Sequence, residues 1–194
     1  MRPLYDFHIK IKNLFEKEIV VGGVVLHKDT RFDDFDGRIS HTEIVGVPEK
    51  FGTVAEIGDT LIFHHHINQE IDKYTVSEGV ARVSYDPENY QGQSYAVIKP
   101  DGSVHMLGNW VFLRAESQKK EDNITAAGLF IGRISKEDRQ EAEVYCEGLG
   151  TEEIGIKKGD VVHYTKNSDY RVKLPSGDEV YRCKPSDIVY VKIA

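Results

Sequence analysis

The sequence IGDTLIFHH at Ile57–His65 returns in the second half of the chain as KGDVVHYTK at Lys158–Lys166. In both copies a Gly-Asp pair, typical of a tight turn, precedes an apolar run that favours a β-strand. An apolar pentad lies upstream of each copy: GGVVL at Gly22–Leu26 and AGLFI at Ala127–Ile131. This shared order of features predicts a duplicated unit.

Short alternating segments extend the β character along the chain. The candidate strands carry β-branched, aromatic or other apolar residues at alternate positions: Asp6–Lys12, Thr60–Phe63, Ala81–Tyr85, Tyr95–Ile98, Val161–Tyr164, Tyr170–Leu174, Glu179–Cys183 and Ile188–Ile193. Turn sequences at Pro100–Gly102 and Pro175–Asp178 predict hairpins. The polar segment Ser135–Glu143 fits either a short helix or a solvated loop. The fold class predicted is therefore all-β.

The duplication predicts two domains, at residues 1–114 and 115–194. We match the segment PDGSVHMLGNWVFL of the first half to PSGDEVYRCKPSDIVYV of the second. On this matching, Asn68–Gln91 is present only in the first half, and its sequence YTVSEGVARVSYD predicts an inserted hairpin. Trp110–Ala115 is then expected to close the first unit and open the second.

Composition and charge exclude several classes of function. The net charge of -7 is spread over 25 basic and 32 acidic residues, without the basic stripe that a nucleic-acid binder needs. We see no signal-peptide pattern and no long apolar run, so we expect a cytoplasmic protein that does not bind a membrane. Cys146 and Cys183 form no disulfide framework and are expected to pack as free thiols.

The chain carries few candidates for metal, cofactor or catalytic sites. Of His64–His66, only the first and third could share a metal if the segment is a strand, and a solvated turn is the expectation. The acidic run Asp33–Asp36 lacks the spacing of a calcium loop. The chain also lacks P-loop, GxSxG, HExxH and GxGxxG motifs. We therefore expect no metal, no cofactor and no enzymatic activity.

The pentads are candidate docking sites. The polar run Glu116–Thr125 is expected to be disordered in the free protein, Gly128 allows a turn, and an apolar cluster follows at Leu129, Phe130 and Ile131. Burying one such side chain contributes roughly 1.5–3 kcal/mol, whereas ordering each backbone residue costs roughly 1–2 kcal/mol. A single loop is therefore a weak binder, and several loops on one oligomer bind well. An ordinary core strand is the alternative for Leu129–Ile131.

A weaker copy of this site is expected at Val24, Val25 and Leu26. Ile19–Val21 extends its apolar run, so a fixed strand pair is an equally good interpretation there.

These motifs resemble the GroES-type co-chaperonin family. Arg2–Ile11 (RPLYDFHIKI) is similar to the first strand of the family, Gly22–Leu26 to the end of its mobile loop, and Ser186–Ile193 (SDIVYVKI) to its closing strand. The heptad AAGLFIG at Ala126–Gly132 is similar to the loop tip of shortened bacteriophage co-chaperonins. The second half lacks a counterpart of the Arg-Pro-Leu strand. The resemblance implies two tandem GroES-like, partly open β-barrels, and the loop tip suggests a phage origin.

The resemblance also implies the function and the partners. A co-chaperonin of this type self-associates into a ring and caps a nucleotide-bound, GroEL-type chaperonin ring, in the host cytoplasm if a phage encodes it. Leu129–Ile131 would be the main anchor and Val24–Leu26 an accessory one. Tyr170 would face the enclosed cavity, or would be a strand residue with its hydroxyl in water. The alternative is a duplicated β-barrel with a structural or assembly role and no chaperonin contact.

Overall fold

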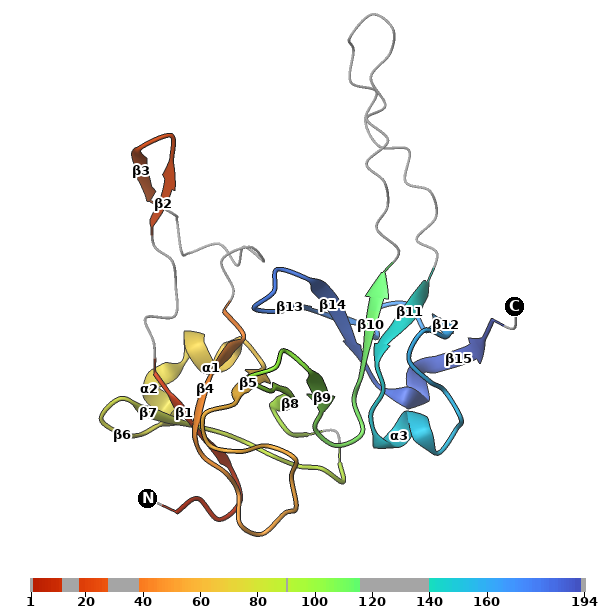
Figure 1. The fold of residues 1–194 in the computed structure, drawn as a ribbon, viewed down its shortest axis with the longest axis horizontal. Helices are drawn as coiled ribbons and strands as arrows, with labels where there is room; N and C mark the ends of the chain where they lie inside the picture. Colours follow the sequence, from red (N-terminus) through yellow and green to blue (C-terminus); the bar gives the residue numbers. More distant parts are fainter. Residues whose placement is uncertain (1, 12–17, 28–38, 90, 116–139, 193–194) are drawn as a thin grey trace, which may run out of the picture.

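The computed structural model describes residues 2–11, 18–27, 39–89, 91–115 and 140–192, and Figure 1 shows how their elements are arranged. These residues form two antiparallel sheets and a separate hairpin, with short helices between strands. The all-β fold class is confirmed. Within the described parts of the chain, no helix is long and apolar enough to cross a membrane.

The first sheet has the strand order β6-β7-β1-β4-β5-β8-β9. Its elements are β1 (Phe7–Lys10), β4 (His41–Gly46), β5 (Thr60–Phe63), α1 (His66–Gln69), α2 (Ile71–Tyr74), β6 (Thr75–Ser77), β7 (Val80–Val83), β8 (Ser94–Ile98) and β9 (Val104–Met106). Between β1 and β4 in sequence lie β2 (Glu18–Val21) and β3 (Val24–His27), which pair only with each other among the described strands.

The second sheet has the order β13-β14-β10-β11-β12-β15. Its elements are β10 (Val111–Ala115), β11 (Glu141–Cys146), α3 (Leu149–Glu152), β12 (Val161–Tyr164), β13 (Tyr170–Lys173), β14 (Glu179–Cys183), a 3-10 turn at Pro185–Asp187 and β15 (Ile188–Val191).

The two sheets repeat the same strand order position by position. β6, β7, β1, β4, β5 and β8 occupy the places of β13, β14, β10, β11, β12 and β15, and β9 is an addition at the edge of the first sheet. Each half therefore winds its strands in the same order around its own core, which is the topology expected of the duplicated unit that the sequence predicts.

The duplication extends to single hydrogen bonds at the Gly-Asp turns. The Ile44 N–H donates to the Asp59 carbonyl and the Gly58 N–H donates to the Ile44 carbonyl; Val144, Asp160 and Gly159 repeat this pattern. The two glycines have φ angles of 96° and 92°, in the left-handed region that glycine adopts without a steric cost. Repeated turn geometry explains why this motif was the clearest repeat in the sequence.

The matching of the later hairpins was wrong. The hairpin that begins at Pro100–Gly102 is β8-β9, whereas the one at Pro175–Asp178 is β13-β14, and these pairs occupy different places in their sheets. The counterpart of β13-β14 is β6-β7, which lies within the segment Asn68–Gln91 that we treated as an insertion. The error arose because a hairpin turn identifies a strand pair without identifying its position in the sheet.

Two strands differ from the expectations. β10 occupies the place of β1, so the second half does have a counterpart of the first strand. This counterpart lacks the Arg-Pro-Leu motif. Glu141–Cys146 is a strand, paired with β10 and β12, so the helix or loop expected over Ser135–Glu143 is wrong for its last three residues. Residues 135–139 lie outside the described part of the chain.

Each sheet encloses an apolar core, and a third apolar cluster joins the two halves. On β5, Leu61 and Phe63 belong to the core of the first half, while Ile62 belongs to the shared cluster. On β10, Phe112 belongs to the shared cluster, while its neighbours on either side belong to the core of the second half. Because successive strand side chains face opposite sides, both strands are buried on two faces, and the two sheets pack on one another through this cluster.

Candidate functional site

The first candidate docking segment is the hairpin β2-β3. Val21 pairs with Val24 across a two-residue turn, and Val20 pairs with Val25. The turn residues Gly22 and Gly23 both have positive φ angles, 58° and 82°. Two positive φ angles define a type I′ turn, whose twist matches that of the flanking strands. The Gly-Gly pair therefore sets the register that brings the apolar residues together.

The apolar side chains of this hairpin are exposed. Relative exposures lie between 46% and 70% for Val20, Val21, Val24, Val25 and Leu26. Figure 1 shows the hairpin apart from the seven-stranded sheet. The strand pair that was one interpretation of this segment is present, but it is no part of a core. Exposed apolar side chains gathered in one hairpin are a candidate site for contact with a partner.

Both candidate docking segments join equivalent pairs of adjacent strands. The segment that contains β2-β3 begins after Lys10 of β1 and ends before His41 of β4, and β1 pairs with β4. The second segment begins after Ala115 of β10 and ends before Glu141 of β11, and Ala115 lies opposite Ala142. Each long connection therefore leaves and re-enters its sheet at neighbouring strands.

The residues expected to form the main anchor lie outside the described residues. They are Gly128, Leu129, Phe130 and Ile131. The structure describes the two strands that hold the ends of this segment, and the anchor itself stays a prediction.

Tyr170 lies at the junction of the two halves. It begins β13 and is half-buried. Its ring stacks on His64 with centroids 4.7 Å apart, and its hydroxyl contacts Nδ1 of His65. Tyr95 approaches the same ring edge-on at 6.1 Å. The tyrosine side chain therefore contacts residues of the first half through both its ring and its hydroxyl.

A half-buried cation, Arg182, lies beside this junction. The guanidinium group of Arg182 stacks on the ring of Trp110 at 4.0 Å and on that of Tyr95 at 4.7 Å, and it donates a hydrogen bond of 3.2 Å to the Tyr95 hydroxyl. Burial raises the pKa of Tyr95 far above its usual range, so this hydroxyl remains protonated and can accept the bond. Stacked aromatic rings compensate a guanidinium group for part of its lost hydration.

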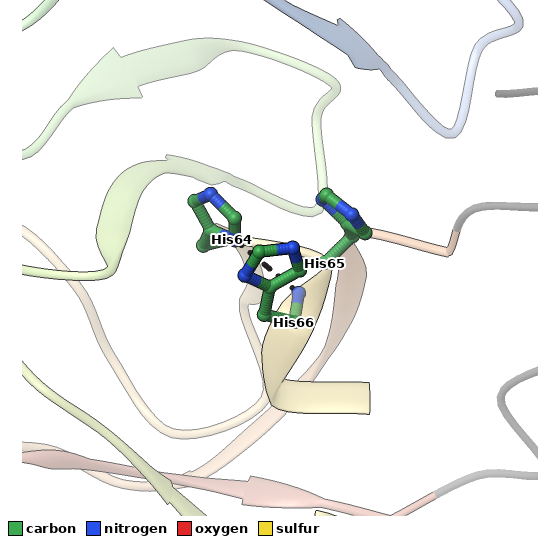
Figure 2. A group of neighbouring side chains, drawn as sticks. All are labelled: His64, His65 and His66. Atoms are coloured by element: carbon green, nitrogen blue, oxygen red, sulfur yellow. Dashed lines mark hydrogen bonds between the residues drawn. The ribbon is translucent and has the colours of Figure 1, made fainter. Parts of the chain in front are cut away.

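His64, His65 and His66 come together at the same place, at the start of α1 (Figure 2). Strand β5 ends at Phe63, so the strand alternation assumed for this run does not apply. The three ring centroids lie 4.4–4.9 Å apart, and one potential ligand atom from each ring lies within 4.8 Å of the others. The helix start, which sequence periodicity did not reveal, makes all three rings neighbours.

Both cysteines are free, as the sequence predicted. Burial raises the pKa of the Cys146 thiol to about 11 and also raises that of Cys183. Cys146 donates to the Val104 carbonyl over 3.3 Å. A protonated thiol is a poor nucleophile and metal ligand, so the two side chains pack as small apolar groups.

Residues 103–191 match the family model of the chaperonin 10 Kd subunit. The match covers the second sheet, together with β9 and the connection to β10. It supports the resemblance to the GroES-type family that the sequence motifs indicated. No curated protein matches the chain.

Proposed function

We propose that this protein is a tandem co-chaperonin, which caps an ATP-dependent chaperonin and has no enzymatic activity of its own. The observation that carries the proposal is the family match at residues 103–191, combined with a first sheet that has the same strand order. The units are those proposed from the sequence, residues 1–114 and 115–194, except that β10 goes with the second unit because both its partners lie there.

The two equivalent connections would carry the contacts with the chaperonin. Leu129, Phe130 and Ile131 would be the main anchor, and the exposed side chains of Val24, Val25 and Leu26 would be the accessory one. In β2-β3 the strands are already paired, so binding there requires less ordering of the backbone than binding by an extended segment. A two-stranded hairpin is only marginally stable alone, and docking on a partner would stabilise it.

A ring of chains in the cytoplasm, or in the host cytoplasm for a phage protein, would make these weak contacts effective. Burying one anchor side chain contributes roughly 1.5–3 kcal/mol. Several loops on one ring act at a high effective concentration once the first is bound. Tyr170 is proposed to border the enclosed cavity, on the surface formed where the two halves meet.

Co-purification with a GroEL-type chaperonin tests the proposal. We expect the full-length protein to be retained by the chaperonin with ATP or an ATP analogue and not without nucleotide. The variant Leu129→Ser/Phe130→Ser/Ile131→Ser should lose most of this retention, and Ile57→Ser, a change at another exposed apolar residue, should keep it. Native mass measurement of the free protein should show a closed oligomer.

The alternative, a structural or assembly protein built from the same two units, makes opposite predictions. It requires that the protein is not retained with any nucleotide, and it allows the triple variant to assemble like the unmodified chain. Retention that is unchanged in the triple variant would instead overturn the assignment of the main anchor.

A further inference from the structure

A three-histidine cluster lies at the contact between the two halves, outside the proposed docking loops. The cluster is made of His64, His65 and His66, which are half-buried, buried and exposed in that order. Their rings gather around the first turn of α1 (Figure 2). We propose that this cluster binds a borderline divalent transition metal such as Zn²⁺, and that the bound metal strengthens the contact between the halves.

The distances are close to those of a metal site. Ligand nitrogens on one tetrahedral zinc ion lie roughly 3.3 Å apart, given zinc–nitrogen bonds of about 2.0–2.1 Å. The potential ligand atoms here all lie within 4.8 Å of one another. Coordination requires side-chain rotations that bring these atoms up to about 1.5 Å closer together, and the exposed ring of His66 has the space to rotate.

The donor set selects the class of metal. Imidazole nitrogens suit Zn²⁺, Cu²⁺ and Ni²⁺, whereas Ca²⁺ and Mg²⁺ require oxygen ligands. Three protein ligands leave one tetrahedral position for a water molecule or another small ligand.

Tyr170 would act as a positioning residue in this site. Its hydroxyl contacts Nδ1 of His65. When Nδ1 donates its proton to that oxygen, Nε2 carries the lone pair that a metal requires. Hydrogen bonds of this kind, from a ligating imidazole to a second residue, fix the orientation of the ring and increase metal affinity.

His64 has a competing local bond. Its Nδ1 accepts the backbone N–H of His66 over 3.2 Å. Metal binding would take this lone pair for the metal or turn the ring. One neutral hydrogen bond of this kind contributes only modestly to stability. Replacing it with a bond from His64 to the metal is therefore favourable.

The location gives the metal a structural effect. The histidines follow β5 of the first sheet, and Tyr170 begins β13 of the second. A metal that fixes His65 therefore fixes the residue that Tyr170 contacts. Binding to the folded state alone raises stability in proportion to the logarithm of metal concentration above the dissociation constant.

Metal titration of the full-length protein, purified without a histidine tag, tests the proposal. Co²⁺ is the probe, because tetrahedral binding gives visible absorption, and Zn²⁺ should displace it. We expect one equivalent of Co²⁺ to bind, and saturating Zn²⁺ to raise the melting temperature. His66→Ala removes one of three ligands, so it should weaken binding at least about 10-fold and reduce the thermal shift.

Matched variants separate this site from other histidines. His105→Ala removes a histidine on β9, outside the cluster, and should bind like the unmodified protein. Tyr170→Phe should weaken metal binding by about 10–100-fold. Tyr190→Phe, which changes the ring that stacks on His163, should not weaken it.

Equal metal affinity in His66→Ala and the unmodified protein, or no saturable absorption, would overturn the site. Equal affinity in Tyr170→Phe would overturn the positioning role. Chaperonin retention is measured separately and does not decide this question.

Discussion

The hydroxyl of Tyr170 contacts the imidazole of His65, although the two residues belong to different sheets and different copies of the repeat. The contact lies beside the apolar cluster shared by the two halves, to which Tyr170 itself is packed. This contact therefore provides a direct way to measure how strongly the halves are coupled.

Removing this hydroxyl should lower stability modestly. In metal-free buffer, we expect Tyr170→Phe to reduce the free energy of unfolding by about 0.5–1.5 kcal/mol, the usual net value of one hydrogen bond. Tyr170→Ala should cost about 3 kcal/mol or more, because the stacked ring is lost as well. Urea unfolding measures both, and Tyr190→Phe, at an exposed ring, is the control that should change little.

The two Gly-Asp turns offer an internal comparison. Asp59 is buried, accepts the Glu56 N–H over 2.7 Å, and pairs with Lys99 at 2.9 Å. Asp160 is more exposed and accepts the Lys157 N–H over 2.8 Å. Asp59→Ala should therefore cost about 2–3 kcal/mol and Asp160→Ala about 1 kcal/mol. Equal costs in denaturant unfolding would show that the buried ion pair contributes nothing beyond the turn.

The exposed hairpin should contribute to binding without contributing to stability. Val24→Ser/Val25→Ser/Leu26→Ser replaces side chains that are exposed in the free protein, so the melting temperature should remain within about a degree of the unmodified value. Chaperonin retention should fall, although less than in the Leu129–Ile131 variant. A clear loss of thermal stability would indicate that the patch is covered in the free protein, and would argue against a docking role.

The thiols should react slowly in the folded state. The pKa of Cys146 is raised to about 11, so at pH 8 its thiolate population is about 100-fold lower than that of an ordinary cysteine. Alkylation by iodoacetamide should accelerate strongly in urea.

The raised pKa of Cys146 also makes the free energy of unfolding depend on pH. At pH values between the pKa of the unfolded thiol and that of the folded thiol, the unfolded chain has lost the proton and the folded chain has kept it. The free energy of unfolding therefore falls as pH rises through this interval. Cys146→Ser should reduce that fall, which unfolding curves at several alkaline pH values will measure.

The sequence predicted those strands whose own residues carry a clear pattern. Thr60–Phe63, Val161–Tyr164 and Glu179–Cys183 have the predicted bounds. His41–Gly46 and Glu141–Cys146 were missed, because polar or charged residues flank their inward-facing side chains. Pairing with β1 and β10 is what orders them. Such pairings are non-local, and a window of one sequence does not contain them.

The candidate site was predictable to a similar extent. The exposed pentad at Gly22–Leu26 was found from composition and spacing, and its hairpin geometry follows from the Gly-Gly turn. The proximity of the three histidine rings was not predicted, because we considered the segment His64–His66 as a strand. A strand end and a helix start depend on how Ile67 and Asn68 are buried, which the local sequence does not determine.

The position of the two long connections has a consequence for engineering. In each half, the chain departs from one strand and returns on the strand hydrogen-bonded to it, so the connection begins and ends on neighbouring strands, which lie about 5 Å apart. Foreign peptides of comparable length can therefore be grafted between Ala115 and Gln140 while the backbone bonds of both strands are kept. The same exchange is possible between Ile11 and Ile39, because Ile11, Ile39 and Ser40 still bond to other described parts of the first half. The protein thus provides a display scaffold with two equivalent insertion points, each of which can be altered while the other is kept as an internal reference.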